Sequence, residues 1–295
     1  MPIWHPPFFC KIKKKEKDFW SALCYDREKG GILLGKKLLK LIFTLFLLAV
    51  LVLVGMEKGP ELWRELTFHW TEHTETELRV KAYADEMGVS YWKYPQSLIE
   101  LLERNPETEE FVLEYPFRKE QAQEAFAYDL SEGVPLMMQW DKRWGYLQYG
   151  SDMVGITGCG PVCLAMAGYY VTDGDDDFHP AKIVEFAEKN GYYSKGNGSS
   201  WTLISEGGVR LGLDVTEIPL VKKRVMDNLN VDNPIICSMR AGDFTTTGHY
   251  IVLVGCEDGL IRVNDPNSYE NSEKLWSYEQ IEGQIRNLWV IRDIP

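Results

Sequence analysis

The stretch GCGPVCLAMA, at residues 158–167, decides the fold of the C-terminal half of the chain. Two glycines flank Cys159, a proline follows, and the rest of the stretch is apolar. Because proline suits the first turn of a helix, the stretch predicts an α-helix that begins at or just before Cys159. A helix N-terminus stabilises a thiolate, and the glycines leave space above the sulfur for a carbonyl group. This pattern is typical of a cysteine nucleophile.

The other cysteines favour different interpretations. Cys163 follows one helical turn after Cys159 and is expected to pack in the core as a small apolar residue. Cys237 and Cys256 lie in apolar, strand-like runs and are expected to be buried and inert. The six cysteines match neither paired zinc ligands nor a disulfide scaffold, although a single bridge among Cys163, Cys237 and Cys256 stays open.

Two apolar runs near the C-terminus predict a β-hairpin. GHYIVLVG, at residues 248–255, reads as a buried strand with His249 at its start. LIRVNDPN, at residues 260–267, follows a turn-prone Glu-Asp-Gly and reads as its antiparallel neighbour. The hairpin would bring Asp265 near His249, where a carboxylate could orient the imidazole. Asn264 is the competing orienting residue, and an Asp before a proline is also a common turn residue.

Two further segments accompany these runs. VPLMMQWDKRWG begins at residue 134, where the apolar runs become shorter and glycines more frequent. GNGSSW, at residues 196–201, is a glycine-rich loop that runs into a helix ending near Gly212. Because no Lys-Ser/Thr pair follows the glycines, the loop does not fit a phosphate-binding motif. A wall of a cleft is the better interpretation.

In the order and spacing of these motifs, the chain resembles the C39-like peptidase family of papain-fold domains. The resemblance covers residues 134–295 and rests on GCGP before an apolar helix, GHYIVLVG and VNDPN. It implies an α+β, papain-like fold. In that fold an N-terminal helical lobe bears the cysteine, and an antiparallel sheet bears the histidine and the aspartate.

The resemblance also implies a set of site residues. Cys159, His249 and Asp265 would form a catalytic triad, and Gln139 of the QWD sequence would help to form the oxyanion hole. Gln139 lies farther from Cys159 than the corresponding glutamine does in bacteriocin-processing members, and Gln148 is the second candidate. The implied substrate-binding residues are Gly158, Ser200, Trp201 and Gly248.

These expectations describe a cysteine peptidase that acts on a peptide or protein substrate without a cofactor or metal. Two alternatives keep the fold. One is a catalytically silent, membrane-tethered binding module, and the other is an amidase that acts on cell-wall peptides. Reactivity of Cys159 toward a thiol reagent would separate the silent module from the enzymes.

The net charge of −12 argues against a nucleic-acid binder, which needs a basic face. The charge is uneven: residues 1–40 carry a net charge of +6, and the remainder carries −18. An acidic body favours basic substrates, but net charge is weak evidence for specificity.

An apolar segment separates the two charge regions. LIFTLFLLAVLVLVGM, at residues 41–56, has no charged residue and follows a lysine-rich stretch. The long basic region and the missing small-residue cleavage site disfavour a cleaved signal peptide, and the missing polar face disfavours a core helix. Residues 38–56 are therefore expected to be a single-pass signal anchor in the cell membrane. The basic head, residues 1–37, would be cytoplasmic, and the catalytic domain would lie outside the membrane.

Residues 57–133 mix apolar and charged residues at helical spacing and predict a solvated helical stalk or subdomain. Pro95 and Pro106 lie near predicted helix starts. Residues 69–73 read HWTEH, which matches a zinc-peptidase pattern with His69 and His73 on one helical face. A solvated helix face is the preferred interpretation, because the surrounding residues are highly charged.

Overall fold

Helix α7 (Cys159–Val171) is the central helix of the C-terminal domain, and nearly all of its residues are buried. A helix that is apolar all round has to be covered on every side. In the structure α7 contacts strand β9 (Gly248–Glu257) and helix α8 (Pro180–Lys189). The predicted start of this helix at Cys159 is confirmed.

The computed structural model describes residues 71–118, 127–196 and 198–294, and, nearer the N-terminus, residues 23–26, 31–34, 39–50, 52, 59, 63 and 68. The chain divides into two units, residues 1–72 and residues 73–295.

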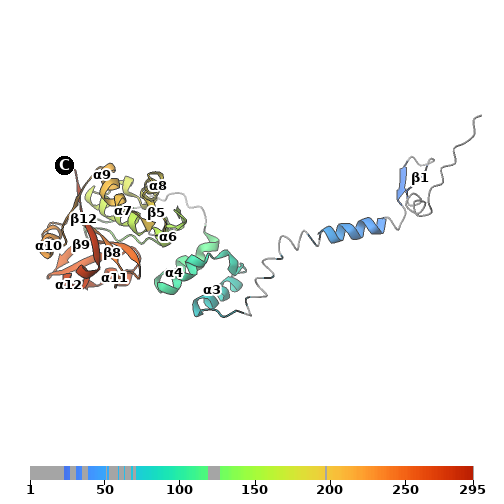
Figure 1. Ribbon diagram of the computed structural model, residues 1–295, viewed down its shortest axis with the longest axis horizontal. Coiled ribbons are helices and arrows are strands. Elements are labelled where there is room, and N and C mark those ends of the chain that lie inside the picture. Colours follow the sequence, from blue (N-terminus) through green and yellow to red (C-terminus); the bar gives the residue numbers. More distant parts are fainter. Residues whose placement is uncertain are drawn as a thin grey trace, which may run out of the picture. The chain divides into compact units, whose positions relative to one another are not determined.

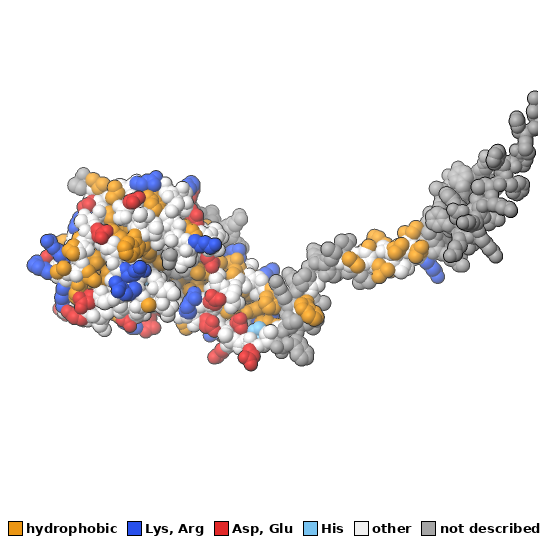
Figure 2. Space-filling model, viewed as in Figure 1, with side chains coloured by type: hydrophobic (Ala, Val, Ile, Leu, Met, Phe, Trp, Pro, Cys, Tyr) orange, Lys and Arg blue, Asp and Glu red, His pale blue; other side chains and the backbone are white. Residues whose placement is uncertain are grey.

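In the first unit, β1 (Leu23–Asp26) pairs antiparallel with β2 (Gly31–Leu34). Residues 39–50 form a helix whose side chains are exposed, and Figure 2 shows its apolar side chains on the surface. None of the helices in the described part of the chain is both long enough and apolar enough to cross a membrane. The predicted anchor also includes residues 38, 51 and 53–56, which lie outside the described residues.

The second unit contains a six-stranded antiparallel sheet with the strand order β11-β10-β9-β8-β12-β7. Figure 1 labels β8, β9 and β12 of this sheet. The strands of the sheet are β7 (Leu213–Glu217), β8 (Ile235–Arg240), β9, β10 (Leu260–Asn264), β11 (Leu275–Trp276) and β12 (Ile285–Asp293). Two short hairpins lie outside it, made of β3 (Gln148–Tyr149) with β4 (Asp152–Met153) and β5 (Tyr193–Ser194) with β6 (Gly198–Ser199). The predicted pairing of β9 with β10 as an antiparallel hairpin is confirmed.

Helices cover both faces of this sheet. Besides α7 and α8, the helices of the C-terminal domain are α6 (Val154–Thr157), α9 (Gly208–Arg210), α10 (Lys222–Leu229), α11 (Tyr269–Glu273) and α12 (Tyr278–Ile281). A π-helical turn at Leu203–Gly207 precedes α9. The glycine-rich loop therefore leads into a helix, as predicted.

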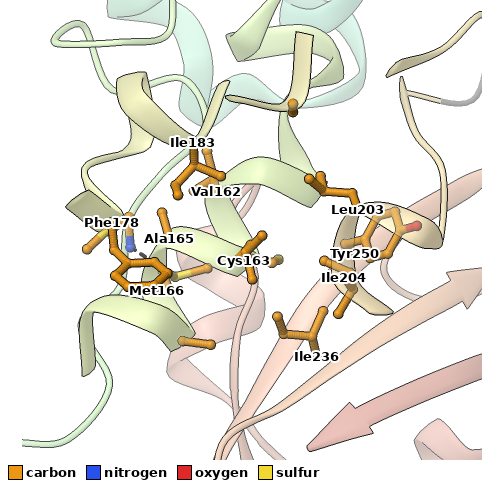
Figure 3. Close-up of a cluster of buried hydrophobic side chains, with 14 of the residues drawn as sticks. Val162, Cys163, Ala165, Met166, Phe178, Ile183, Leu203, Ile204, Ile236 and Tyr250 are labelled. Carbon is orange, nitrogen blue, oxygen red and sulfur yellow. Dashed lines mark hydrogen bonds between the residues drawn. The ribbon is translucent and has the colours of Figure 1, made fainter. Parts of the chain in front are cut away.

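The sheet separates two hydrophobic cores. In the first core, α7 packs between α8 and the sheet. Figure 3 shows Cys163 and Val162 of α7 with Ile183 of α8 and with Ile236 and Tyr250 of the sheet. The second core lies on the opposite face, where α10 and α12 cover apolar side chains of the central strands. The chain thus has the mixed helical and antiparallel-sheet architecture that the sequence predicts.

The segment before this domain forms three helices, α3 (Glu75–Glu86), α4 (Gln96–Arg104) and α5 (Glu109–Glu114). The sequence predicts a solvated stalk here. The helices do form, and they also bury apolar side chains, including Leu98, Ile99, Leu101, Leu102, Phe111 and Val112. The ring of Phe111 stacks on Tyr146 of the C-terminal domain, so this helical segment is packed against that domain.

Candidate active site

Cys159 is the first residue of α7 and is partly exposed. At this position its N–H has no acceptor within the helix, and the sulfur lies at the positive end of the helix dipole. Cys163 is fully buried, and burial raises the pKa of its thiol well above the usual range. Of the two cysteines on α7, Cys159 is therefore the one that a substrate can reach.

The remaining described cysteines do not compete for this role. Cys237 is fully buried, and burial raises the pKa of its thiol. Cys256 is partly exposed rather than buried as predicted, because it lies at the end of β9, next to the hairpin turn. The structure has free thiols at Cys159, Cys163, Cys237 and Cys256. No disulfide bond therefore joins any two of the last three.

His249 and Asp265 form a hydrogen-bonded pair that links the two strands of the hairpin. His249 Nε2 lies 2.7 Å from Asp265 Oδ1, and both side chains are almost completely buried. The Asp265 carboxylate also accepts hydrogen bonds from the backbone N–H of Asn267 and from Asn271 Nδ2, both at 2.9 Å. These three contacts offset the cost of burying the charged group. The competing residue, Asn264, instead donates to the carbonyl oxygen of Val134 at 3.0 Å.

The pKa of His249 reflects opposing effects. Burial lowers it, but the neighbouring Asp265 charge and hydrogen bond, together with contributions from Cys159, raise the pKa of the imidazole to about 10. Because Cys159 is among the groups that raise this pKa, the cysteine and histidine side chains lie close to each other. Because Nε2 faces Asp265, Nδ1 is the ring nitrogen left to face the thiol. This arrangement can hold a thiolate beside an imidazolium.

The two candidate glutamines occupy different environments. Gln139 is buried, and its Nε2 donates to the carbonyl oxygen of Gly155 at 2.9 Å. Its Oε1 is also buried and has no hydrogen-bond partner among the described residues. Gln148 is exposed on β3 and donates to Gly150 O at 2.8 Å. Gln139 is thus hydrogen-bonded to α6, the short helix directly before α7, whereas Gln148 lies at the surface.

A buried polar group that no sequence motif indicates lies beside α7. Ser199 of β6 shares a hydrogen bond of 2.7 Å with the hydroxyl of Tyr149, and its carbonyl oxygen accepts one from Tyr250 at 3.2 Å. A Cβ on Gly160, the residue after Cys159, would lie 2.6 Å from Ser199 Oγ. Gly160 is therefore required for the close approach of this loop to the nucleophile, and the pairing of Ser199 with Tyr149 had no signal in the sequence.

Two of the four predicted substrate-binding residues adjoin Cys159 and His249 in the chain. Gly158 is the N-cap of α7, and Gly248 begins β9 immediately before His249. Ser200 shares a hydrogen bond of 2.6 Å with the hydroxyl of Thr202. Trp201 is 42% exposed, which leaves its ring available to a ligand.

The helical segment, α3 to α5, contacts the loop that follows Asp265. Glu107 accepts hydrogen bonds from the hydroxyl of Ser268 at 2.8 Å and from the backbone N–H of Tyr269 at 2.6 Å. Asn105 Nδ2 and Trp140 Nε1 both donate to the carbonyl oxygen of Asn267. These contacts join residues at least 127 positions apart and have no signal in the sequence.

The described residues of the zinc-peptidase pattern lie at the start of α3 and make local contacts there. His73 Nδ1 lies 3.0 Å from Glu77 Oε2, and Glu77 also completes a capping box with Thr74 at the start of α3. Glu72 and His73 thus precede the helix, and His69 lies outside the described residues. Within the described part of the chain, no group of three or more His, Cys, Asp or Glu side chains could hold a metal ion.

The family assignment rests on the model of the Peptidase_C39 like family, which matches residues 131–292, more than half of the chain. The chain belongs to this family. The matched region contains Cys159, His249 and Asp265 and all of the six-stranded sheet except its last residue, Asp293, and we call it the C39-like domain.

Several solved structures resemble the C39-like domain at low identity. The peptidase domain of Streptococcus ComA, a bifunctional ABC transporter involved in a quorum-sensing pathway, is 18% identical, with a TM-score of 0.39. The match covers 55% of this chain and 99% of that domain. The peptidase domain of Streptococcus mutans ComA, in complex with a small-molecule inhibitor, is 15% identical with a TM-score of 0.33 over 55% of this chain and 99% of that chain. No curated protein matches the chain significantly.

Proposed function

We propose that the chain is a papain-like cysteine peptidase in which Cys159, His249 and Asp265 form the catalytic triad. The observation that carries the proposal is the buried His249–Asp265 pair, with Nε2 and Oδ1 2.7 Å apart, beside a partly exposed cysteine at a helix N-terminus. This arrangement supplies the three groups that thiol-dependent acyl transfer requires: a nucleophile, a base and a group that orients the base.

In the proposed reaction, the Cys159 thiolate attacks the carbonyl carbon of a peptide bond, and the carbonyl oxygen becomes an oxyanion. The Cys159 N–H and the Gln139 amide would stabilise that charge. The C–N bond then breaks, and the His249 imidazolium donates its proton to the leaving amine. Water attacks the resulting thioester, and His249 accepts a proton from the water. Release of the carboxylic acid restores the thiolate and the imidazolium.

Hydrolysis of a peptide library by the full chain and by Cys159→Ala and His249→Ala variants tests this mechanism. Both variants should lose hydrolysis, because each lacks a group that takes part in bond breaking. Cys256→Ala is the matched control, since Cys256 is also a partly exposed free thiol. Full activity of Cys159→Ala would contradict the proposal.

Alkylation of Cys159 by iodoacetamide at neutral pH separates the peptidase from a catalytically silent binding module. A thiolate paired with an imidazolium should react much faster than Cys256, because the thiolate is the reactive form. If Cys159 and Cys256 react at similar rates, the silent module is favoured. An amidase acting on cell-wall peptides would give the same labelling and would differ only in its substrate.

We also propose that residues 38–56 anchor the chain in the cell membrane, with the N-terminus in the cytoplasm and the C39-like domain outside. The uncharged run at residues 41–56 and the +6 charge of residues 1–40 support this arrangement. Leu45→Lys together with Leu48→Lys should release the protein from washed membranes, since each central lysine costs insertion about 2.5–3.5 kcal/mol. Recovery of the wild-type chain in the soluble fraction would contradict the anchor.

A further inference from the structure

Two arginines lie next to each other at one end of the sheet. Arg240 is the last residue of β8, and its guanidinium donates to the carbonyl oxygen of Ile285 at 3.2 Å. Arg286 is the next residue of β12, and both arginine side chains are exposed. Among the described residues, neither arginine forms an ion pair, although the chain as a whole carries a charge of −12.

A β-bulge sets the position of Arg286. The pairing of β12 with β8 shifts between Ile285 and Asn287, so Arg286 is the extra residue of the bulge. Bulges redirect a side chain that a regular strand would place elsewhere. The Arg286 guanidinium lies over the ring of Trp201, 5.6 Å from its centroid.

Trp201 provides a rigid support for this contact. Its Nε1 donates to Ser238 Oγ at 3.0 Å, and its ring packs edge-on against Trp289 with centroids 6.0 Å apart. The same ring is 42% exposed. Trp201 and Arg286 therefore form a surface with an apolar part and a cationic part, which we call the Trp201–Arg286 platform.

The platform and Arg240 are linked to the proposed nucleophile and base through neighbouring residues. In the register of β8 with β9, Arg240 pairs with Gly248, the residue before His249. Trp201 follows two residues after Ser199, which lies against Gly160 and hence next to Cys159. Both arginines thus belong to segments that neighbour those of His249 and Cys159.

Asp243, three residues after Arg240, is hydrogen-bonded to Gln284 and forms no described ion pair with either arginine. Asp243 Oδ2 accepts a hydrogen bond from Gln284 Nε2 at 2.7 Å, and the Asp243 N–H donates to Gln284 Oε1 at 2.7 Å. Two exposed guanidiniums on neighbouring strands raise the local positive potential, which favours binding of an anion. Their fork-shaped donors match a carboxylate well.

We propose that Arg240 and the Trp201–Arg286 platform form a subsite for a carboxylate of the peptide substrate. The carboxylate would bind the guanidiniums while the adjoining methylene groups contact the Trp201 ring. This inference rests on the proposed peptidase function and adds a substrate class to it. It runs against the net charge, which favours basic substrates, because local charge at the site outweighs distant charge screened by salt.

Cleavage of two peptide libraries, one with free and one with amidated C-termini, tests the subsite. The wild-type chain should cleave peptides with Glu at one position near the scissile bond about tenfold faster than peptides with Gln there, a ratio that corresponds to about 1.4 kcal/mol. Arg286→Gln and Arg240→Gln should each reduce that ratio severalfold. Arg262→Gln is the matched control, because Arg262 is an exposed strand arginine already paired with Glu257, and it should keep the wild-type ratio.

The outcomes separate the two proposals. If the preference follows the free C-terminus instead of Glu and still needs Arg286, the recognised carboxylate is the chain end. Equal cleavage of Glu and Gln peptides and of free and amidated peptides by the wild type overturns the subsite and leaves the peptidase intact. An unchanged preference for Glu over Gln in both Arg286→Gln and Arg240→Gln also overturns the subsite and leaves the peptidase proposal intact. If the wild type cleaves no peptide and Cys159 is unreactive, the peptidase proposal fails and the subsite fails with it.

Discussion

The carboxylate of Glu107, in the helical segment, accepts a hydrogen bond of 2.8 Å from the hydroxyl of Ser268, three residues after Asp265. It accepts a second from the backbone N–H of Tyr269, at the first turn of α11. Asn105 adds a contact to Asn267 in the same loop. The helical segment thus holds the loop that carries the proposed orienting carboxylate, as well as joining the C39-like domain to the residues before it.

We predict that Glu107→Gln lowers kcat/KM by about tenfold, since hydrogen bonds to a charged acceptor contribute about 1.5–3 kcal/mol. Because Glu107 would act through the position of Asp265, the pH dependence of Cys159 alkylation should change as well. The matched control is Glu109→Gln, since Glu109 forms an exposed ion pair with Arg79 in the same segment. A lower melting temperature with an unchanged alkylation profile would reduce Glu107 to a purely structural role.

Asp265→Asn should lower kcat/KM about 100-fold or more, because the amide no longer orients the imidazole or stabilises its charged form. The pKa of His249, which Asp265 raises, should fall. Because the imidazolium donates the proton to the leaving amine, the pH range in which the chain hydrolyses peptides should narrow from its alkaline side. Asp214→Asn, at an exposed carboxylate that pairs with Arg292, should leave the range unchanged. An unaltered alkaline limb in Asp265→Asn would contradict the assignment.

The His249–Asp265 pair should also make stability depend on pH. The pKa of His249 is raised from 6.5 to about 10, so the folded protein binds its proton more tightly than the unfolded chain does. The contribution to stability is then fully present below about pH 6.5 and is lost as the pH rises toward 10. Urea unfolding should show the difference between wild type and His249→Gln shrinking from pH 6 to pH 10. A difference that grows over this range would show that the shift has the opposite sign.

Gly160→Ala should reduce activity strongly and destabilise the fold by about 1–3 kcal/mol through overpacking. The new Cβ would meet Ser199 Oγ at 2.6 Å and Ser199 Cβ at 2.7 Å, and Ser199 is held by Tyr149. Gly283→Ala is the control, since nothing lies within 4 Å of a Cβ placed there. Thermal unfolding and peptide hydrolysis measure the two effects. Wild-type activity in Gly160→Ala would mean that the segment with Ser199 shifts to make room for the new Cβ at little cost.

The role of the two glutamines can be decided by comparing Gln139→Ala with Gln148→Ala. We expect Gln139→Ala to lower kcat by about 100- to 1000-fold with little change in KM, as loss of an oxyanion donor does. It should also cost about 1–3 kcal/mol of stability, because Gly155 O loses its buried donor. Gln148→Ala should have little effect on either quantity. The reverse ranking in kcat would transfer the role to Gln148.

Much of the domain is visible in local patterns of the sequence. The apolar run after Pro161 predicts a buried helix with Cys159 at its start, and the structure has that helix. The runs around His249 and Asp265 predict a hairpin, and strand pairing then brings the two residues together. These features depend on periodicity, turn residues and short chain separations, which are properties of neighbouring residues.

Contacts between distant residues could not be read in that way. The sequence predicts the helices of the segment at residues 57–133 but not the contact of Glu107 with Ser268, which are 161 residues apart. It singles out Trp201 but not Arg286, whose direction depends on a bulge in the pairing of two strands. Local pattern determined the helix, the hairpin and the candidate nucleophile and base of this protein. Only the tertiary structure decided their surroundings, because hydrogen bonds and ring contacts between remote segments depend on how the elements pack and leave no periodic trace in the chain.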